Sequence, residues 1–280
     1  MSRVLITGAA GLVAAALADA YRDHDVVALA HGDLDITDEL AVEALVQRER
    51  PDIIFNCAVI GVDACESDPL LASRVNELGP AHLASAAERV GAAIVHFSSN
   101  YVFDGDRAGG LPYTIDDEPR PINVYGATKL LGERAVTRAA ARAFVIRTSW
   151  VFGAAKSSFL GTVAARLRRG ERVQAIRNTF ASTTFVGDLA SRVVAIVERG
   201  DAGTYHVVNA GVCSYETFAR EAARLVDARA TLIETTLESR PAPRPHWTPM
   251  RCLLSERLGL PPMRGWESAL AEYAGARTKW

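Results

Sequence analysis

The stretch Arg-Val-Leu-Ile-Thr-Gly-Ala-Ala-Gly-Leu-Val-Ala, residues 3–14, decides the fold. Its first part, Arg3–Thr7, is a short apolar run of the kind found in buried strands. Gly8 and Gly11 follow at once, and Leu12–Arg22 is alanine-rich with helical spacing. A strand, a glycine turn and a helix in this order predict the start of an α/β domain.

The same alternation continues through the first half of the chain. Strands are expected at 26–30, 53–57, 93–99 and 144–148, and helices at 38–49, 69–90 and 124–140. We expect the helix at 69–90 to be broken near Gly79-Pro80. Right-handed crossovers then give an α/β, Rossmann-type, doubly wound parallel sheet.

The glycine turn is suited to binding a pyrophosphate. Small residues let a phosphate approach the backbone N–H groups at the start of the first helix. Ala14 stands where a third glycine would be expected, and it still permits close packing of the helix on the strand. A glycine pair alone also closes ordinary strand-to-helix turns, so the position of the pair after the first strand carries the prediction.

The end of the second predicted strand leaves the choice of cofactor open. Ala30-His31-Gly32 provides neither the acid that binds an NAD ribose nor an arginine for a 2′-phosphate. We therefore expect either NADH or NADPH to be used. Asp33, Asp35 and Ile36 either line an adenine pocket or form a solvated acidic turn.

The second half of the chain is less regular. Helices are expected at 159–169, 188–199 and 215–227, a strand at 204–208, and mostly loop at 239–262. We expect a dinucleotide-binding domain over residues 1–150, rejoined by about 173–208. Residues 151–280 are expected to form mainly a smaller, mixed α/β, substrate-binding lobe.

The composition excludes several classes of protein. With 49% hydrophobic residues and a net charge of −2, the 280-residue chain can bury a core and has no basic footprint for nucleic acid. No apolar run is long enough to cross a membrane, and no secretory signal is expected. The four cysteines show neither disulfide nor metal-ligand spacing, so we expect no metal and a cytoplasmic location. A homodimer is left open.

Tyr125 and Lys129 form the first candidate catalytic pair. They lie four residues apart in a predicted helix, and therefore on one face of it. An ammonium group beside a phenol should lower the phenol pKa, which suits proton transfer to or from a carbonyl oxygen. The chain has only three lysines, which favours a specific need for this one. An exposed helix pair is the alternative.

Ser99 ends the predicted strand 93–99, beside the crevice where such folds bind ligands. Its hydroxyl can hydrogen-bond a substrate carbonyl, although serines at this point also cap turns. The chain has no Gly-x-Ser-x-Gly elbow, which argues against a serine hydrolase.

These motifs together resemble the extended short-chain dehydrogenase/reductases, and within them the dTDP-4-dehydrorhamnose reductases. The resemblance is carried by FSSNYVFDG at 97–105, PINVYGATK at 121–129, RTSWVFG at 147–153 and VDACE at 62–66. It extends more loosely through 203–206 to Arg240-Pro241. It implies an NAD(P)H-dependent oxidoreductase that reduces the 4-keto group of a nucleotide-linked, 4-keto-6-deoxy sugar.

The resemblance also implies a role for each matching residue. Tyr125 would donate the proton, Lys129 would hold the nicotinamide ribose, and Ser99 would polarise the carbonyl. Three groups of residues would bind the cofactor: Gly8, Gly11, Leu12 and Val13 the pyrophosphate, Asp35 and Ile36 the adenine, and Ala58 and Val59 the nicotinamide. The sugar would be bound by Ser99, Asn100, Tyr101 and Trp150.

Some positions depart from the family pattern. Asn100 replaces an aspartate, and little of the family's Asp-Gln-x-Gly-x-Pro-Thr remains at 178–184. Asn100 and Tyr101 also replace the acidic pair that a 4,6-dehydratase needs. Two alternatives stay open: an epimerase or reductase acting on another nucleotide sugar, and a non-catalytic NADP-binding subunit resembling the regulatory subunit of methionine adenosyltransferase.

Overall fold

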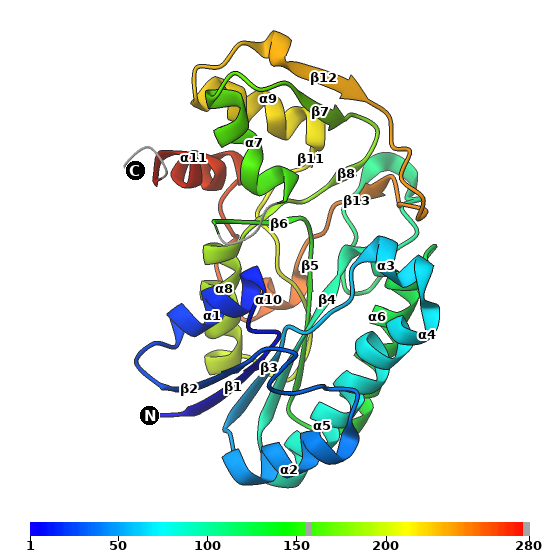
Figure 1. Cartoon of the computed structure of the whole chain (residues 1–280), viewed down its shortest axis with the longest axis vertical. Coiled ribbons are helices and arrows are strands. Elements are labelled where there is room, and N and C mark those ends of the chain that lie inside the picture. Colours follow the sequence, from blue (N-terminus) through cyan, green and yellow to red (C-terminus); the bar gives the residue numbers. More distant parts are fainter. Residues whose placement is uncertain (155–157, 277–280) are drawn as a thin grey trace.

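The computed structural model describes residues 1–154 and 158–276. Figure 1 shows two lobes, with a parallel sheet and its helices below and a smaller mixed lobe above. The sheet has the order β10-β5-β4-β3-β1-β2. Its strands are β1 (Arg3–Thr7), β2 (Asp25–Leu29), β3 (Ile53–Asn56), β4 (Ala93–Ser99), β5 (Ala143–Thr148) and β10 (Gly203–His206).

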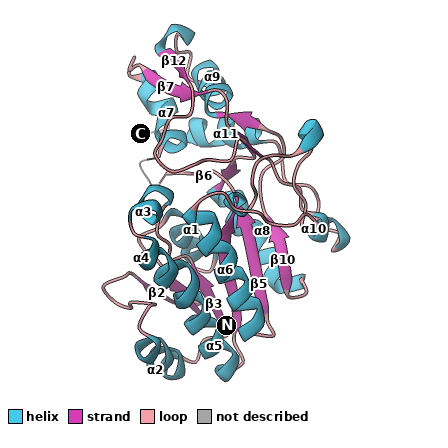
Figure 2. Cartoon of the chain, turned by 90° about the vertical axis from the view of Figure 1, so that its right-hand side faces the viewer, coloured by secondary structure: helices cyan, strands magenta, loops and turns pink. Residues whose placement is uncertain are grey.

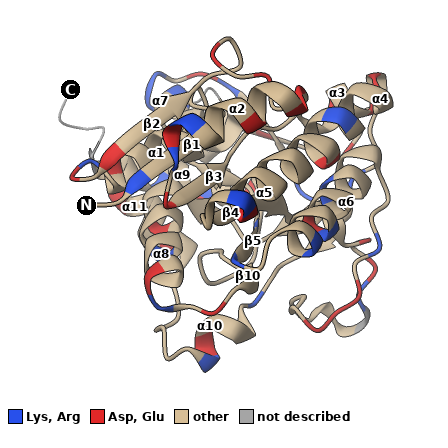
Figure 3. Cartoon of the chain, turned by 90° about the horizontal axis from the view of Figure 1, so that it is seen from below, with Lys and Arg blue, Asp and Glu red and all other residues tan. Residues whose placement is uncertain are grey.

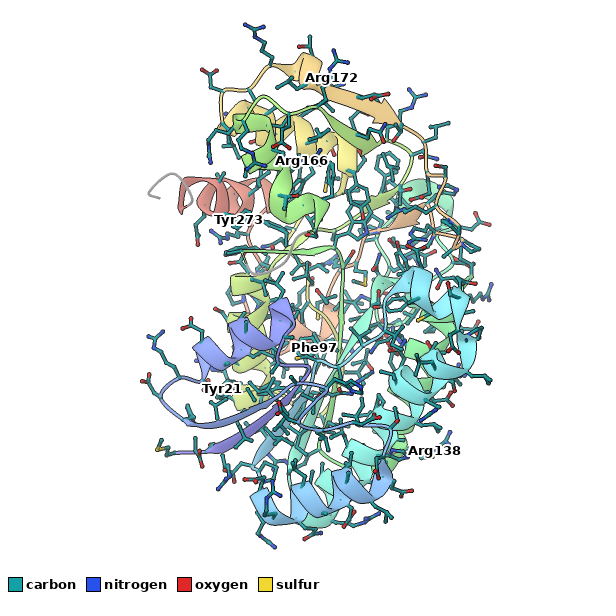
Figure 4. The ribbon with its side chains drawn as sticks, viewed as in Figure 1. Tyr21, Phe97, Arg138, Arg166, Arg172 and Tyr273 are labelled. Carbon is teal, nitrogen blue, oxygen red and sulfur yellow. The ribbon has the colours of Figure 1, made fainter. Side chains whose placement is uncertain are left out.

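Helices cover both faces of this sheet, which confirms the doubly wound prediction. Apolar residues of α1 (Leu12–Ala20) and α8 (Val186–Arg199) share one core with the sheet; Tyr21 and Phe97, labelled in Figure 4, belong to it. Three helices form the opposite core, namely α2 (Glu39–Glu49), α5 (Gly79–Val90) and α6 (Val124–Ala139). Figure 3 shows acidic and basic residues interspersed along the helices.

The chain changes direction beside β1. From β1 it passes to β2 at one edge and then returns to β3 on the other side of β1. Ligands of doubly wound sheets bind at such a switch point, outside the carboxyl ends of the strands.

The expected break near Gly79-Pro80 is a change of helix type: the segment 69–90 stays helical, but a π-helical turn ends at Leu78, directly before Gly79. Pro80 lies in the first turn of α5, and its missing N–H leaves one helical hydrogen bond unmade there. The π-helical turn at Arg74–Leu78 separates α4 (Pro69–Ser73) from α5. Such turns recur at functional sites.

The upper lobe is built on short strands. Its helices are α7 (Phe159–Arg168), α9 (Tyr215–Leu225) and α11 (Trp266–Ala276), and β7 (Val173–Ile176) pairs with β12 (Ile233–Thr236). Arg166, labelled in Figure 4, donates a hydrogen bond to the Arg172 carbonyl ahead of β7. A second sheet joins β11 (Cys213–Ser214), β8 (Phe180–Ala181) and β13 (Trp247–Thr248).

Short elements connect the two lobes. One of them is β6 (Val151–Phe152), paired with β9 (Thr184–Phe185). Two further short helices lie against the lower lobe, α3 (Val62–Ser67) beside α6 and α10 (Leu253–Arg257) beside β10. Within the stretch 173–208, α8 and β10 lie in the lower lobe, and Figure 2 shows β10 beside β5, whereas β7 lies in the upper lobe. No described helix is long and apolar enough to cross a membrane.

Candidate active site

The carboxyl end of β4 meets the start of α6 in a pocket of about 240 Å³. Ser99, Asn100, Tyr101, Tyr125 and Trp150 all line it. Five residues predicted from separate parts of the sequence therefore share one cavity. Its walls come from β4, α6 and the loop that follows β5.

Glycine and asparagine position α6 against the end of β4. A Cβ at Gly126 would lie 2.0 Å from the Tyr101 carbonyl oxygen, so only glycine allows this approach. Asn123 caps the helix by accepting a hydrogen bond from the Gly126 N–H at 2.7 Å, and its amide donates to the Pro243 carbonyl at 2.8 Å. The Tyr101 and Tyr125 rings consequently meet edge to face, with centroids 5.9 Å apart.

The Ser99 hydroxyl is held by its neighbours. It accepts a hydrogen bond from the Tyr101 N–H at 3.2 Å and donates to Asn100 Oδ1 at 3.1 Å. Asn100 Nδ2 donates in turn to Thr248 Oγ1 at 2.6 Å, in the upper lobe. Asn100 thus links the orientation of Ser99 to the position of β13.

Tyr125 keeps its proton at neutral pH. Burial raises the pKa of its phenol to about 12, and the Ser99 hydroxyl opposes part of this rise. The expectation that Lys129 lowers this pKa is wrong for the chain by itself, because burial outweighs any effect of the ammonium. A phenol that stays protonated can serve as a proton donor.

Lys129 lies one helical turn beyond Tyr125, and only 2% of it is exposed. Its Nζ is 3.2 Å from His96 Nε2. Burial lowers the pKa of Lys129 to about 8, against the opposing effects of Glu133, Cys57 and Cys65. A buried lysine with few polar contacts is not an exposed helix pair, which removes that alternative.

The glycine turn packs directly against the loop after β3. Gly8 has φ +71°, and a Cβ there would lie 2.7 Å from the Ala58 nitrogen and 2.8 Å from the Cys57 carbonyl. The Gly11 N–H closes the turn on the Gly8 carbonyl at 2.8 Å. Leu12 is buried, whereas Val59 is half exposed. The turn and the Ala58 loop therefore lie together at the switch point.

A carboxylate does lie at the end of β2: it belongs to Asp33, three residues beyond Ala30. Asp33 Oδ2 accepts a hydrogen bond from the Ala30 N–H at 2.8 Å. The sequence places Asp33 in the turn after the strand but does not show that its carboxylate folds back onto Ala30. Asp35 is exposed and accepts from the Thr37 N–H at 2.9 Å, while the Ile36 side chain is buried against Gly79.

We expect Asp33→Asn to raise kcat/KM for NADPH by about 3–30-fold and to change that for NADH little. Removing the carboxylate lowers its repulsion of a 2′-phosphate, and an exposed charge contact is worth roughly 1–2 kcal/mol at most. Steady-state kinetics with both cofactors measures the ratio. Asp35→Asn is the matched control, and an equal effect of both variants would contradict a specific role for Asp33.

Trp150 joins the pocket to the upper lobe in a strained conformation. Its φ is +41°, which is rare for a bulky residue and is typical of functional sites. Its ring lies 4.1 Å from the Tyr215 ring, centroid to centroid. The Arg240 guanidinium lies over the Tyr215 ring, 5.7 Å from the ring centroid. Arg244 is buried and binds both oxygens of Asp63 at 2.8 and 2.9 Å.

Three buried polar residues were missed by the sequence analysis. Asn56 ends β3, His96 follows the apolar start of β4, and Asn76 lies in the π-helical turn. Asn76 binds the Ile60 N–H at 3.1 Å and Thr128 Oγ1 at 3.3 Å, so it ties the loop after β3 to α6. A polar residue inside an apolar run is the signal that could have found them.

A family model described as "RmlD substrate binding domain" matches residues 2–278. The chain belongs to this family. A dTDP-4-dehydrorhamnose reductase of Mycolicibacterium smegmatis is 40% identical over 98% of this chain and 85% of its own length. A dTDP-4-keto-6-deoxy-D-glucose reductase of Streptomyces niveus is 35% identical over 96% of both chains.

A solved structure extends the likeness of this RmlD-family chain to three dimensions. It is the dTDP-4-dehydrorhamnose reductase of Bacillus anthracis, in complex with NADP. Its TM-score is 0.92 at 31% identity, covering 97% of this chain and 98% of that one. The resemblance inferred from the motifs is therefore confirmed over nearly the whole chain.

Proposed function

We propose that the chain reduces the C4 ketone of a nucleotide-linked, 4-keto-6-deoxy sugar with NADPH or NADH. One observation carries the proposal: Ser99 and Tyr125 share a pocket, and Lys129 lies one turn below it. This set suits carbonyl reduction. Relatives named as reductases of dTDP-linked keto sugars support the substrate class.

The residues present fit a nicotinamide dinucleotide. The absence of a side chain at Gly8 and the free start of α1 at Gly11 suit a pyrophosphate, since α1 has no side-chain cap to compete for its first N–H groups. Leu12 and Val13 would flank the pyrophosphate, Asp35 and the Ile36 backbone the adenine, and Ala58 and Val59 the nicotinamide. When bound, the nicotinamide supplies a hydride.

The chain's own residues handle the proton. Ser99 donates a hydrogen bond to the ketone oxygen after releasing Asn100, which increases the polarity of the carbonyl. Tyr125 transfers its phenolic proton to that oxygen as the alcohol forms. Lys129 binds the ribose hydroxyls, and as an ammonium it stabilises the phenolate that is left behind.

The upper lobe and the loop at Trp150 would bind the nucleotide and sugar. Asn100, Tyr101 and Trp150 face the sugar, and the charges of Arg240 and Arg244 reach the Tyr101 hydroxyl, where they lower its pKa against the rise caused by burial. Arg240 is ion-paired with Glu238 and Arg244 with Asp63, so a diphosphate would have to displace or share these carboxylates to bind the guanidinium groups. We propose residues 1–150 with part of 173–208 as the cofactor unit and most of 151–280 as the substrate unit.

A non-catalytic NADP-binding role is the second candidate, since the fold alone serves both. Loss of NADPH absorbance on mixing with a dTDP-linked 4-keto-6-deoxy sugar tests the proposal. We expect stoichiometric oxidation and one new alcohol in the product. Tight NADPH binding without turnover of any such nucleotide sugar would overturn it and favour the non-catalytic role.

A further inference from the structure

Beneath the pocket, Lys129 ends a chain of buried polar side chains. The other members of this chain have no part in the proposed mechanism. Thr7 Oγ1 is 2.9 Å from Asn56 Oδ1, and Asn56 Nδ2 is 3.2 Å from His96 Nδ1. His96 Nε2 is in turn 3.2 Å from Lys129 Nζ. All four residues are at most 2% exposed. The chain crosses from β1 through β3 and β4 to α6.

Backbone contacts fix the direction of these hydrogen bonds. Asn56 Oδ1 accepts from the Ala58 N–H at 3.3 Å as well as from the Thr7 hydroxyl. A flipped amide would place its NH₂ group against the Ala58 N–H, donor against donor. Asn56 therefore donates from Nδ2, and His96 Nδ1 must accept.

The tautomer of His96 follows from this direction. His96 is fully buried, and burial, the largest cause, lowers the pKa of its imidazole well below its usual value, so the ring is neutral. A neutral imidazole carries one proton, and with Nδ1 accepting, that proton is on Nε2. The Nε2–H points at Lys129 Nζ, which can accept it only through the lone pair of an uncharged amine.

We propose that His96 is a positioning residue whose Nε2–H favours the uncharged amine of Lys129, and that the ribose hydroxyls of the cofactor draw Lys129 back to its ammonium form. The catalytic consequence rests on the proposed reductase function, but the tautomer does not. In this proposal, Asn56 fixes the tautomer of His96, and His96 acts on Lys129.

Three other titratable groups act on the pKa of Lys129. Glu133 on α6, Cys57 after β3 and Cys65 on α3 all favour the ammonium. Glu133, however, is held by two hydrogen bonds from Arg147, at 2.9 and 2.7 Å, and a third from Ser98. Burial raises the pKa of both cysteine thiols, so they stay uncharged. Burial therefore outweighs these groups in setting the pKa of Lys129.

The proposal predicts how activity depends on pH. Lys129 has a depressed pKa near 8, so its ammonium form is lost as pH rises through that value. Since the ammonium stabilises the Tyr125 phenolate, kcat/KM should fall on the alkaline side near pH 8. Tyr125 itself stays protonated there.

Nitrogen NMR of ¹⁵N-histidine-labelled protein tests the tautomer without substrate or cofactor. We expect His96 in the Nε2–H form. Asn56→Asp should switch it to Nδ1–H, because an ionised carboxylate can only accept hydrogen bonds. Thr7→Val is the matched control: it removes one bond to Asn56 but leaves the Ala58 N–H, so the tautomer should not change. An Nδ1–H or doubly protonated His96 in the wild type overturns the proposal.

The pH profile of kcat/KM tests the catalytic consequence. In Asn56→Asp, the alkaline limb should move upward by at least one pH unit, while that of Thr7→Val stays in place. An unmoved limb in an active Asn56→Asp variant contradicts the link between His96 and Lys129. If no nucleotide sugar is reduced at all, the reductase function fails and the NMR result still decides the tautomer.

Discussion

Replacing Tyr125 by phenylalanine is expected to lower kcat by about 10²–10⁴-fold, with NADPH binding little changed. The variant keeps the ring that meets Tyr101 edge to face, and it removes only the hydroxyl. The phenol pKa is raised to about 12, so Tyr125 is protonated at neutral pH and the variant removes this proton donor from the pocket. Single-turnover kinetics and fluorescence titration with NADPH separate the two effects.

Tyr205→Phe provides the control for Tyr125→Phe. It removes a buried hydroxyl that donates to the Asp201 carbonyl, far from the pocket on β10. Its kcat should stay within about twofold of wild type, although stability can fall by about 1 kcal/mol. Turnover near the wild-type rate in Tyr125→Phe would remove this residue from the mechanism.

The sheet could be predicted from the sequence because its strands are buried on both faces. Such strands form continuous apolar runs, and β4 at Ala93–Ser99 was placed with its observed bounds. The π-helical turn could not be predicted. It depends on Asn76, whose side chain binds partners 16 and 52 residues away along the chain. Local patterns do not contain such contacts.

The candidate site likewise has features that the sequence predicts and features that it does not. Ser99, Tyr125 and Lys129 could be named because chemistry restricts the residue types and their spacing. Their electrostatic state could not, since it depends on burial that only the folded chain defines. The phenol pKa is raised rather than lowered, and the amine faces His96. The position of the Asp33 carboxylate could not be predicted either, because it depends on how the turn after β2 folds back onto Ala30.

The second large effect concerns stability, at an ion pair between β5 and α6. Arg147 donates two hydrogen bonds to Glu133, at 2.9 and 2.7 Å, and both side chains are at most 7% exposed. The guanidinium also lies 5.3 Å from the centre of the Phe103 ring. Glu133 is one turn beyond Lys129 on α6, so this pair fixes the part of the helix that carries the catalytic lysine.

Arg147→Met is expected to lower the free energy of unfolding by about 3–5 kcal/mol, because it leaves the Glu133 carboxylate buried with only Ser98 as a partner. Urea unfolding followed by circular dichroism measures the loss. Combining it with Glu133→Leu should restore much of the stability, since the uncompensated charge is then gone. Arg220→Met, which breaks the half-exposed pair with Glu216, should cost no more than about 0.5 kcal/mol. If the Arg147 and Arg220 variants lost equal amounts, burial would not be what makes the β5–α6 pair important.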